Sequence, residues 1–193
     1  MVLLSVCALT FICFWSPPCY YAGKPLAHWF QMLNDLSPGF DPPAEWKNLG
    51  TNEITVLIKA LQLRDSKVAQ VHESLFESAW KGAGPAIFKR LPPPLHSEDV
   101  ALNALLILSR IGTDCRPAYP AMIHVLQKDR SAFLRGQAAG ALATIDPKNP
   151  LVKPALTSSL TDTNLSPFTV KYVRDKLNES NPEMKATPVT GPR

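Results

Sequence analysis

Residues that could support metal binding or acid–base catalysis are thinly spread along this chain. A helical metal site needs two histidines about four residues apart, and no pair has that spacing. The histidines are His28, His72, His96 and His124. Paired carboxylates such as Glu73 with Glu77 fall on a hydrophilic helix face, where ordinary solvation explains them. We therefore predict no metal site and no catalytic carboxylate pair.

Signatures of nucleophilic catalysis and phosphate binding are also weak. Gly82–Gly84 has no expected strand before it and no Lys-Ser or Lys-Thr after it, and a phosphate-binding loop needs both. Cys115 lies in a turn and fits a small packed residue better than a reactive thiol, although Arg116 beside it favours a lower pKa. These residues predict no cofactor and no enzymatic activity.

The net charge of +4 is spread along the chain. A nucleic-acid-binding protein is expected to show a basic stripe, often with aromatic residues between the charges. The densest basic group here is Lys128, Arg130 and Arg135, and it contains Asp129. This pattern is typical of solvated helix ends, so no nucleic-acid partner is expected.

The segment Met1–Ala22 stands apart because it contains no charged residue. Its apolar run, Val2–Trp15, is about the length of a signal-peptide core and shorter than the roughly 20 residues of a spanning helix. No basic residue precedes the run and no clear small-x-small cleavage site follows it, so a buried first helix is the alternative. We expect residues 1–22 to be a signal peptide or membrane anchor, and the protein to be exported or membrane-anchored rather than cytoplasmic.

After this segment, apolar residues recur at spacings of three and four, which predicts helices throughout. The expected helices cover about residues 26–33, 54–61, 68–80, 85–91, 100–111, 119–126, 134–145, 152–160 and 170–177. No stretch alternates with period two for long enough to form a strand. We expect an N-terminal helix and Pro-rich loop over 23–48, a repeat domain over 49–180 and a disordered tail over 181–193.

Two glycines stand inside one of the expected helices. Gly136 and Gly140 are four residues apart on one helical face. Each costs about 1 kcal/mol relative to alanine in a helix interior. Their presence predicts a close approach of a neighbouring helix at both positions.

The clearest organisation is an internal repeat. Leu126 and Asp129 return further along the chain as Leu160 and Asp162, and Ile111 returns at nearly the same interval as Ile145. This period of roughly 34 residues is typical of stacked helical hairpins, each unable to bury its apolar face alone. The sequence therefore predicts an all-α superhelix.

The unit from Pro120 to Ile145 resembles HEAT repeats, including the bacterial type named after phycobilisome lyases. It has Pro120 in the first helix, Asp129 in the turn and Leu134-Arg135 early in the second helix. The resemblance covers about three and a half units, from Leu49 to Leu177, and the N-terminal part is similar to exported bacterial proteins of this kind. It departs from the pattern over 85–111, where a triple proline replaces the turn Asp. It implies that Asp129 accepts backbone N–H groups and that Arg135 reaches Asp129 or Asp162.

The resemblance also implies a function in binding. In this family the second helices line the concave side of the superhelix. Asn103, Arg110, Gln137 and Thr144 occupy equivalent positions there, so they are candidates for a polar ladder that binds a protein or peptide. An ordinary solvated stripe is the alternative interpretation.

Two other functions remain as alternatives to this non-enzymatic scaffold. One is a bilin lyase-like enzyme or accessory of the phycobilisome-lyase type, for which only Asp114, Cys115 and Arg116 offer suitable chemistry. The other is a HEAT-like DNA-binding protein. The identity of a partner does not follow from these residues.

Overall fold

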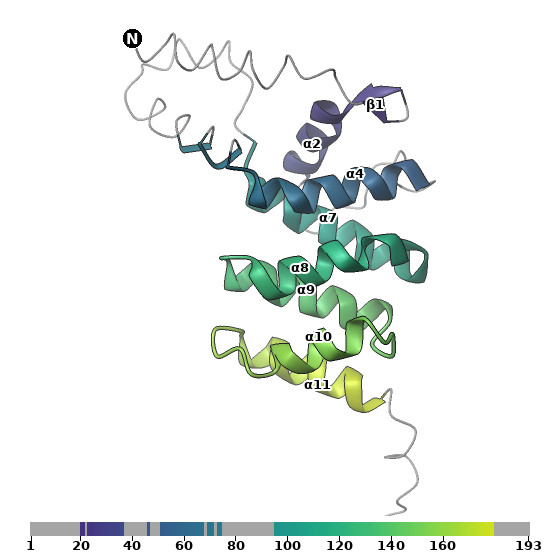
Figure 1. Ribbon diagram of the computed structural model, residues 1–193, viewed down its shortest axis with the longest axis vertical. Helices are drawn as coiled ribbons and strands as arrows, with labels where there is room; N and C mark the ends of the chain where they lie inside the picture. The colour runs from purple at the N-terminus through teal and green to yellow at the C-terminus, as the bar shows by residue number, and fades with distance from the viewer. Residues whose placement is uncertain are drawn as a thin grey trace, which may run out of the picture. The chain divides into compact units, whose positions relative to one another are not determined.

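The computed structural model describes residues 20–21, 23–36, 46, 51–67, 69–71, 73–74 and 95–179 (Figure 1). These residues fall into two compact units, 1–104 and 105–193, and helix α7 (Ser97–Ile111) contributes residues to both. Apart from one hairpin of two-residue strands, the regular elements described are helical, so the predicted all-α class is confirmed. The expected helix at 85–91, the tail at 181–193 and nearly all of the segment 1–22 lie outside the described residues.

Unit 1 begins with a short hairpin that the sequence pattern did not predict. Strand β1 (Tyr20–Tyr21) pairs antiparallel with β2 (Lys24–Pro25), and Gly23 in the turn has a φ of 75°. That left-handed backbone conformation favours glycine. The Trp29 indole N–H of α2 (Leu26–Asn34) donates to the Tyr21 carbonyl at 3.0 Å. Tyr20 and Tyr21, the last described residues of the segment predicted as a signal peptide or membrane anchor, therefore contact α2 and β2.

The core of unit 1 forms where α2 meets α4 (Thr51–Gln62) and a 3-10 turn, η1 (Leu63–Asp65). The indoles of Trp29 and Trp46 stack edge to face with their centroids 5.0 Å apart, and this geometry is favourable for aromatic pairs. Its buried apolar residues include Phe30, Leu33, Val56, Leu57, Leu61 and Val100. The described residues of 67–74 are helical, as the spacing predicted.

Unit 2 contains two consecutive helical hairpins (Figure 1). After a 3-10 segment, η2 (Gly112–Ala118), helix α8 (Tyr119–Lys128) packs against α9 (Ala132–Ile145), and α10 (Val152–Ser159) packs against α11 (Pro167–Glu179). Helix α10 also contacts α8, and α11 also contacts α9, so the first helices form one layer and the second helices another. Pro120 and Pro154 stand one repeat apart in the first turns of α8 and α10, where a missing N–H costs least.

Helix α9 lies at the centre of this unit. Ala138, Ala139, Ala141 and Ala143 are all buried, and such small side chains let neighbouring helices approach closely. Its first turn is capped by the Ser131 hydroxyl, which accepts from the Leu134 N–H at 3.4 Å. Only one stripe of α9 faces outward.

The two glycines of α9 differ in their surroundings. A Cβ on Gly136 would lie 3.5 Å from the Thr169 hydroxyl oxygen of α11, an ordinary contact distance. No atom of the described residues lies within 4 Å of the Cβ position of Gly140. The predicted close approach is therefore present at Gly136 and wrong at Gly140.

Among all the helices described, none is long and apolar enough to cross a bilayer.

Candidate functional site

Arg135 joins the turns that end the two first helices of unit 2. Its Nε donates to Asp162 Oδ2 at 2.8 Å, and its Nη1 donates to the Asp129 carbonyl at 2.9 Å. Asp129 Oδ1 in turn accepts from the Ser131 N–H at 2.7 Å. The three residues singled out from the repeat pattern thus lie in one network, which links neighbouring repeats.

The charge of Asp162 is stabilised by this network. The Arg135 guanidinium, followed by the Asn164 backbone N–H, lowers the pKa of the Asp162 carboxyl below its usual 3.8. Both side chains of the ion pair are largely buried. A charge-assisted pair in that setting is stabilising rather than exposed to a ligand, so these residues are structural.

Asn103 does not face an open groove, which corrects its assignment to the polar ladder. It is 5% exposed, and its amide donates to the Leu33 carbonyl at 2.7 Å and the Leu36 carbonyl at 3.1 Å. Leu33 lies in the last turn of α2, where carbonyls have no partner within the helix, and Leu36 follows the end of the helix. The side chain is therefore occupied in fastening α2 to α7.

Two further residues of the ladder, Gln137 and Thr144, lie on the outer stripe of α9. Gln137 is half-buried, and no hydrogen-bond partner is found for its amide among the residues described. Thr144 is exposed, and its hydroxyl donates to the Gly140 carbonyl at 2.8 Å and lies 2.9 Å from the Tyr172 hydroxyl of α11. Together with Phe133 on the same stripe, these residues mark a surface that spans α9 and α11.

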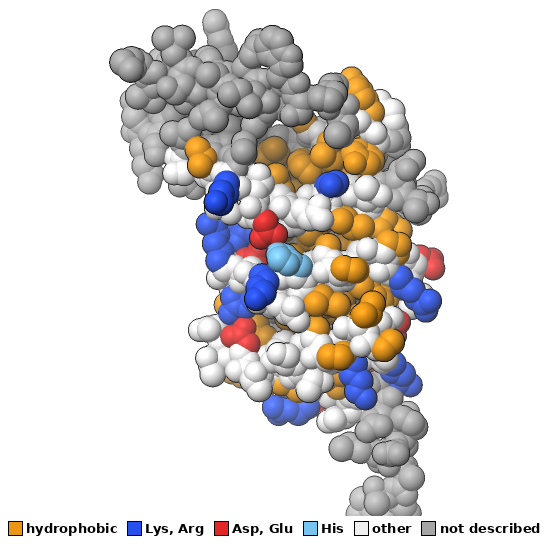
Figure 2. Space-filling view, in the orientation of Figure 1, with side chains coloured by type: hydrophobic (Ala, Val, Ile, Leu, Met, Phe, Trp, Pro, Cys, Tyr) orange, Lys and Arg blue, Asp and Glu red, His pale blue; other side chains and the backbone are white. Residues whose placement is uncertain are grey.

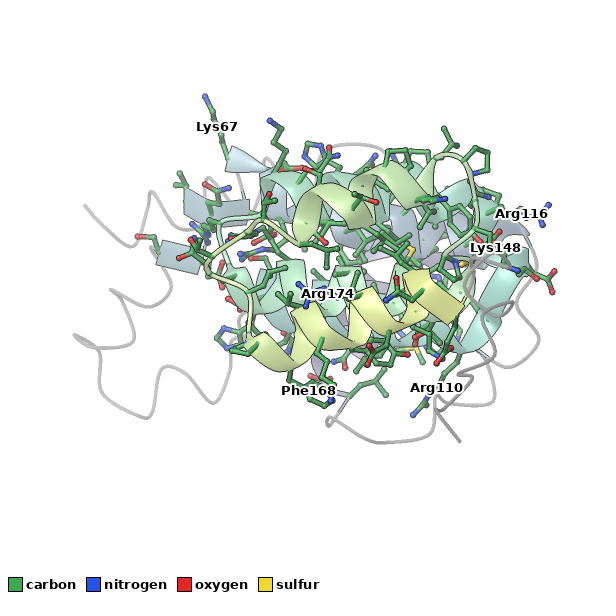
Figure 3. All side chains as sticks on the ribbon, turned by 90° about the horizontal axis from the view of Figure 1, so that it is seen from below. Lys67, Arg110, Arg116, Lys148, Phe168 and Arg174 are labelled. Carbon is green, nitrogen blue, oxygen red and sulfur yellow. The ribbon has the colours of Figure 1, made fainter. Side chains whose placement is uncertain are left out.

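Two phenylalanines make this surface unusual. Phe133 near the start of α9 is 56% exposed, and Phe168 near the start of α11 is 79% exposed. Figure 3 shows Phe168 and Arg110, the remaining ladder residue, projecting from the same side of the unit. We call this surface the second-helix face. Its defining residues are Phe133, Gln137, Gly140, Thr144, Phe168 and Tyr172.

The opposite face, formed by α8 and α10, also exposes apolar side chains (Figure 2). Leu151 is 64% exposed there, and Pro120 in α8 and Pro154 in α10 are exposed as well. Those prolines stand in the first turns of their helices, so helix initiation accounts for them. Exposed His124 lies on this face as well.

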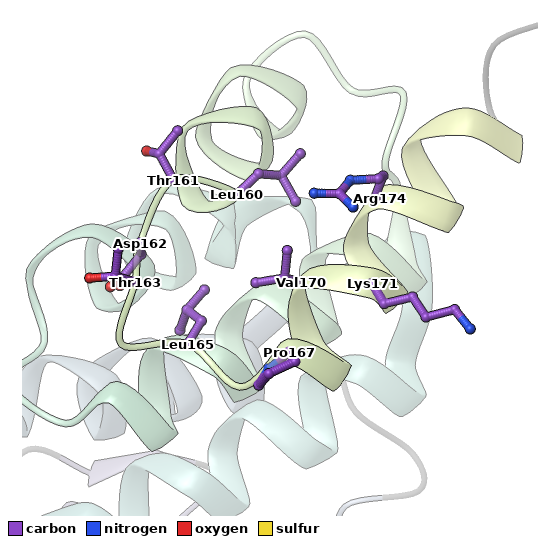
Figure 4. Close-up of a pocket in the computed structure, with 9 residues that line it drawn as sticks. All are labelled: Leu160, Thr161, Asp162, Thr163, Leu165, Pro167, Val170, Lys171 and Arg174. Carbon is purple, nitrogen blue, oxygen red and sulfur yellow. The ribbon is translucent and has the colours of Figure 1, made fainter.

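A shallow hollow of about 370 Å³ lies between α10 and α11. Figure 4 shows Leu160, Val170 and Arg174 turned toward it, whereas Lys171 points away. The acid on its rim is Asp162, which Arg135 already engages. The hollow therefore resembles an open gap beside a helix pair more than a shaped ligand pocket.

A polar cluster in unit 1 was not found from the sequence. Arg64 Nη1 donates to the buried Ser97 hydroxyl at 3.2 Å, and that hydroxyl donates to Glu73 Oε2 at 3.0 Å. The imidazole of His96 lies 3.8 Å from the other oxygen of Glu73. Ser97 is 1% exposed and its hydroxyl is held between Arg64 and the Glu73 carboxylate, so it is not accessible to a substrate as nucleophilic catalysis requires. The cluster fastens the start of α7.

Cys115 is fully buried, and burial raises the pKa of its thiol to about 11. The lower thiol pKa expected from neighbouring Arg116 is therefore wrong, because desolvation by burial raises the pKa and the charge of Asp114 adds to the increase. Within the described part of the chain, no three His, Cys, Asp or Glu side chains are grouped as metal ligands. Burial and the raised pKa therefore do not support a reactive thiol at Cys115.

Comparisons of the chain with protein-family models, curated proteins and solved structures gave no match.

Proposed function

We propose that this chain is a non-enzymatic scaffold of HEAT-like repeats that binds another protein through its second-helix face. The repeat-linking contacts of Arg135 support the HEAT-like part of the proposal. The binding part depends on two exposed aromatic side chains, Phe133 and Phe168, which lie on the adjacent second helices α9 and α11. Large aromatic side chains dominate the energetics of protein interfaces, and leaving two of them in water is otherwise unfavourable.

Gly140 supports the same proposal. Glycine in a helix interior is less stable than alanine by roughly 0.8–1.0 kcal/mol. Since no described atom approaches its Cβ position, packing within unit 2 does not account for that cost. A partner whose backbone approaches the helix closely would account for it.

The proposal includes export or membrane attachment through residues 1–22, as predicted from their composition. Neither alternative function gains a supporting observation. A bilin lyase would need an accessible nucleophile at Asp114–Arg116, and the Cys115 thiol is buried with a raised pKa.

Photo-crosslinking in host cells tests this function. A benzophenone amino acid would replace Phe133 or Phe168, with replacement of exposed His124 on α8 as the matched control. We expect a shared crosslinked protein at Phe133 and Phe168 that is missing at His124. Equal crosslinking at all three positions, or at His124 alone, would contradict the proposed face.

A further inference from the structure

Helix α2 is a helical segment that α7 binds, and α7 holds the second-helix position of its repeat in the sequence pattern. The Asn103 amide donates to the carbonyl of Leu33, in the last turn of α2, and to that of Leu36, just after the helix. Apolar Trp29, Phe30 and Leu33 on one side of α2 are buried. The contact with α7 thus consists of carbonyls that accept from a side-chain amide, while the apolar stripe of α2 is buried in the core of unit 1, where α2 meets α4.

The repeat places a similar amide on α9, where no described segment covers it. Gln137 stands one repeat after Asn103, and Gly140 follows Leu106 by the same interval. The Asn103 amide is occupied, whereas that of Gln137 has no partner among the described residues. Beside it, Gly140 leaves room for a backbone to approach.

Positive charge on the second-helix side of unit 2 complements the negative C-terminal end of a helix. The C-terminus of a helix carries roughly half a negative charge, and α2 is followed at once by Asp35. The second-helix side of unit 2 presents exposed Arg110, which projects together with Phe168 (Figure 3). A helix end with an acidic residue therefore complements it in sign.

We propose that Phe133, Gln137 and Gly140 bind the C-terminal end of an amphipathic helix of a partner protein. Gln137 donates to its last-turn carbonyls as Asn103 does to those of α2. The apolar stripe of the partner helix lies on Phe133, and its acidic end lies toward Arg110. This inference rests on the proposed binding function and specifies its partner as a helix end.

The probe for the test is a peptide of residues 24–36 with an amidated C-terminus. A covalent staple between positions 27 and 31, on the side opposite Trp29 and Leu33, keeps it helical. Its binding to the full-length protein is measured by fluorescence anisotropy. Gln137→Ala is expected to weaken binding about tenfold, which corresponds to about 1.4 kcal/mol. Gly140→Leu is expected to weaken it more than tenfold by filling the open space.

The matched control is Gln127→Ala, which removes the same amide from an exposed position on α8 and is expected to leave affinity unchanged. A second peptide carries four additional helical residues, so that the last-turn carbonyls become intrahelical acceptors, and it is expected to lose binding. Equal affinity in all variants, equal affinity of the two peptides, or no binding of the first peptide would overturn the helix-end inference. If only the helix-end inference fails, crosslinking at Phe133 and Phe168 still captures the partner. If the proposed function fails as well, that crosslinking is lost too.

Discussion

At the scale of single residues, Arg135 and Asp162 form an ion pair that links the repeats of unit 2. Arg135→Ala is expected to lower the free energy of unfolding by about 1.5–3 kcal/mol, because a largely buried charge-assisted pair is lost. Urea unfolding followed by circular dichroism measures the change. Lys176→Ala, which removes the more exposed ion pair with Glu179, is the control and should leave stability nearly unchanged, because solvent screens this pair. A loss of partner binding without any loss of stability in Arg135→Ala would contradict the structural role.

The same pair makes a prediction about pH. The pKa of Asp162 is lowered on folding from 3.8, so its contribution to stability is present above 3.8 and is lost as pH falls through the folded-state pKa. The stability difference between the native protein and Asp162→Asn should therefore be constant near neutral pH and shrink in acid below 3.8. A difference that grows with acidification would show that the sign is wrong.

At the scale of elements, Asn103 decides whether α2 stays attached to α7. Asn103→Ala leaves the carbonyls of Leu33 and Leu36 without their donor, so we expect a loss of about 2 kcal/mol or more. Hydrogen exchange should show the effect first in α2 (Leu26–Asn34), and exposed Asn178→Ala is the matched control. Unchanged protection of α2 would mean that its apolar stripe alone suffices to hold it.

In helix α9, a substitution is expected to increase the stability of the protein rather than reduce it. Gly140→Ala is expected to stabilise the protein by about 0.5–1 kcal/mol, since the helical backbone suits alanine and the Cβ position is open. Thermal unfolding measures this increase. If Gly140→Ala lowers the melting temperature, a neighbour that the described residues do not include must cover this position.

The helices of unit 2 could be predicted from sequence because their apolar spacing is local and their starts carry proline or serine. The contacts of Arg135 could be predicted from its position in the repeat. Asn103 was misassigned because its acceptors lie up to 70 residues away, and no periodicity reports which segment covers a helix face. The hairpin at Tyr20–Pro25 was missed because two-residue strands leave no alternating pattern. The exposure of Phe133 and Phe168 likewise needed the packing of α9 beside α11.

At the scale of the whole molecule, the boundary of the N-terminal segment can be tested by truncation. A chain that starts at Cys19 keeps the Tyr21 carbonyl that Trp29 uses, and we expect its helicity and unfolding to match those of the full chain. A chain that starts at Gly23 loses that acceptor and the β1 strand, so a stability loss of about 1 kcal/mol is expected. Circular dichroism and urea unfolding distinguish the two. Loss of cooperative unfolding in the longer version would place part of residues 1–18 in the core.

The central claim is that the second-helix face binds the partner of this protein. The most direct measurement is the affinity of the crosslinked partner for the double variant Phe133→Ala with Gln137→Ala. We expect binding at least about tenfold weaker, a loss of about 1.4 kcal/mol or more, while the melting temperature stays close to that of the native protein because both side chains lie on the outer stripe of α9. An unchanged affinity would contradict the claim and move the site to the α8 and α10 face or to the hollow beside Arg174.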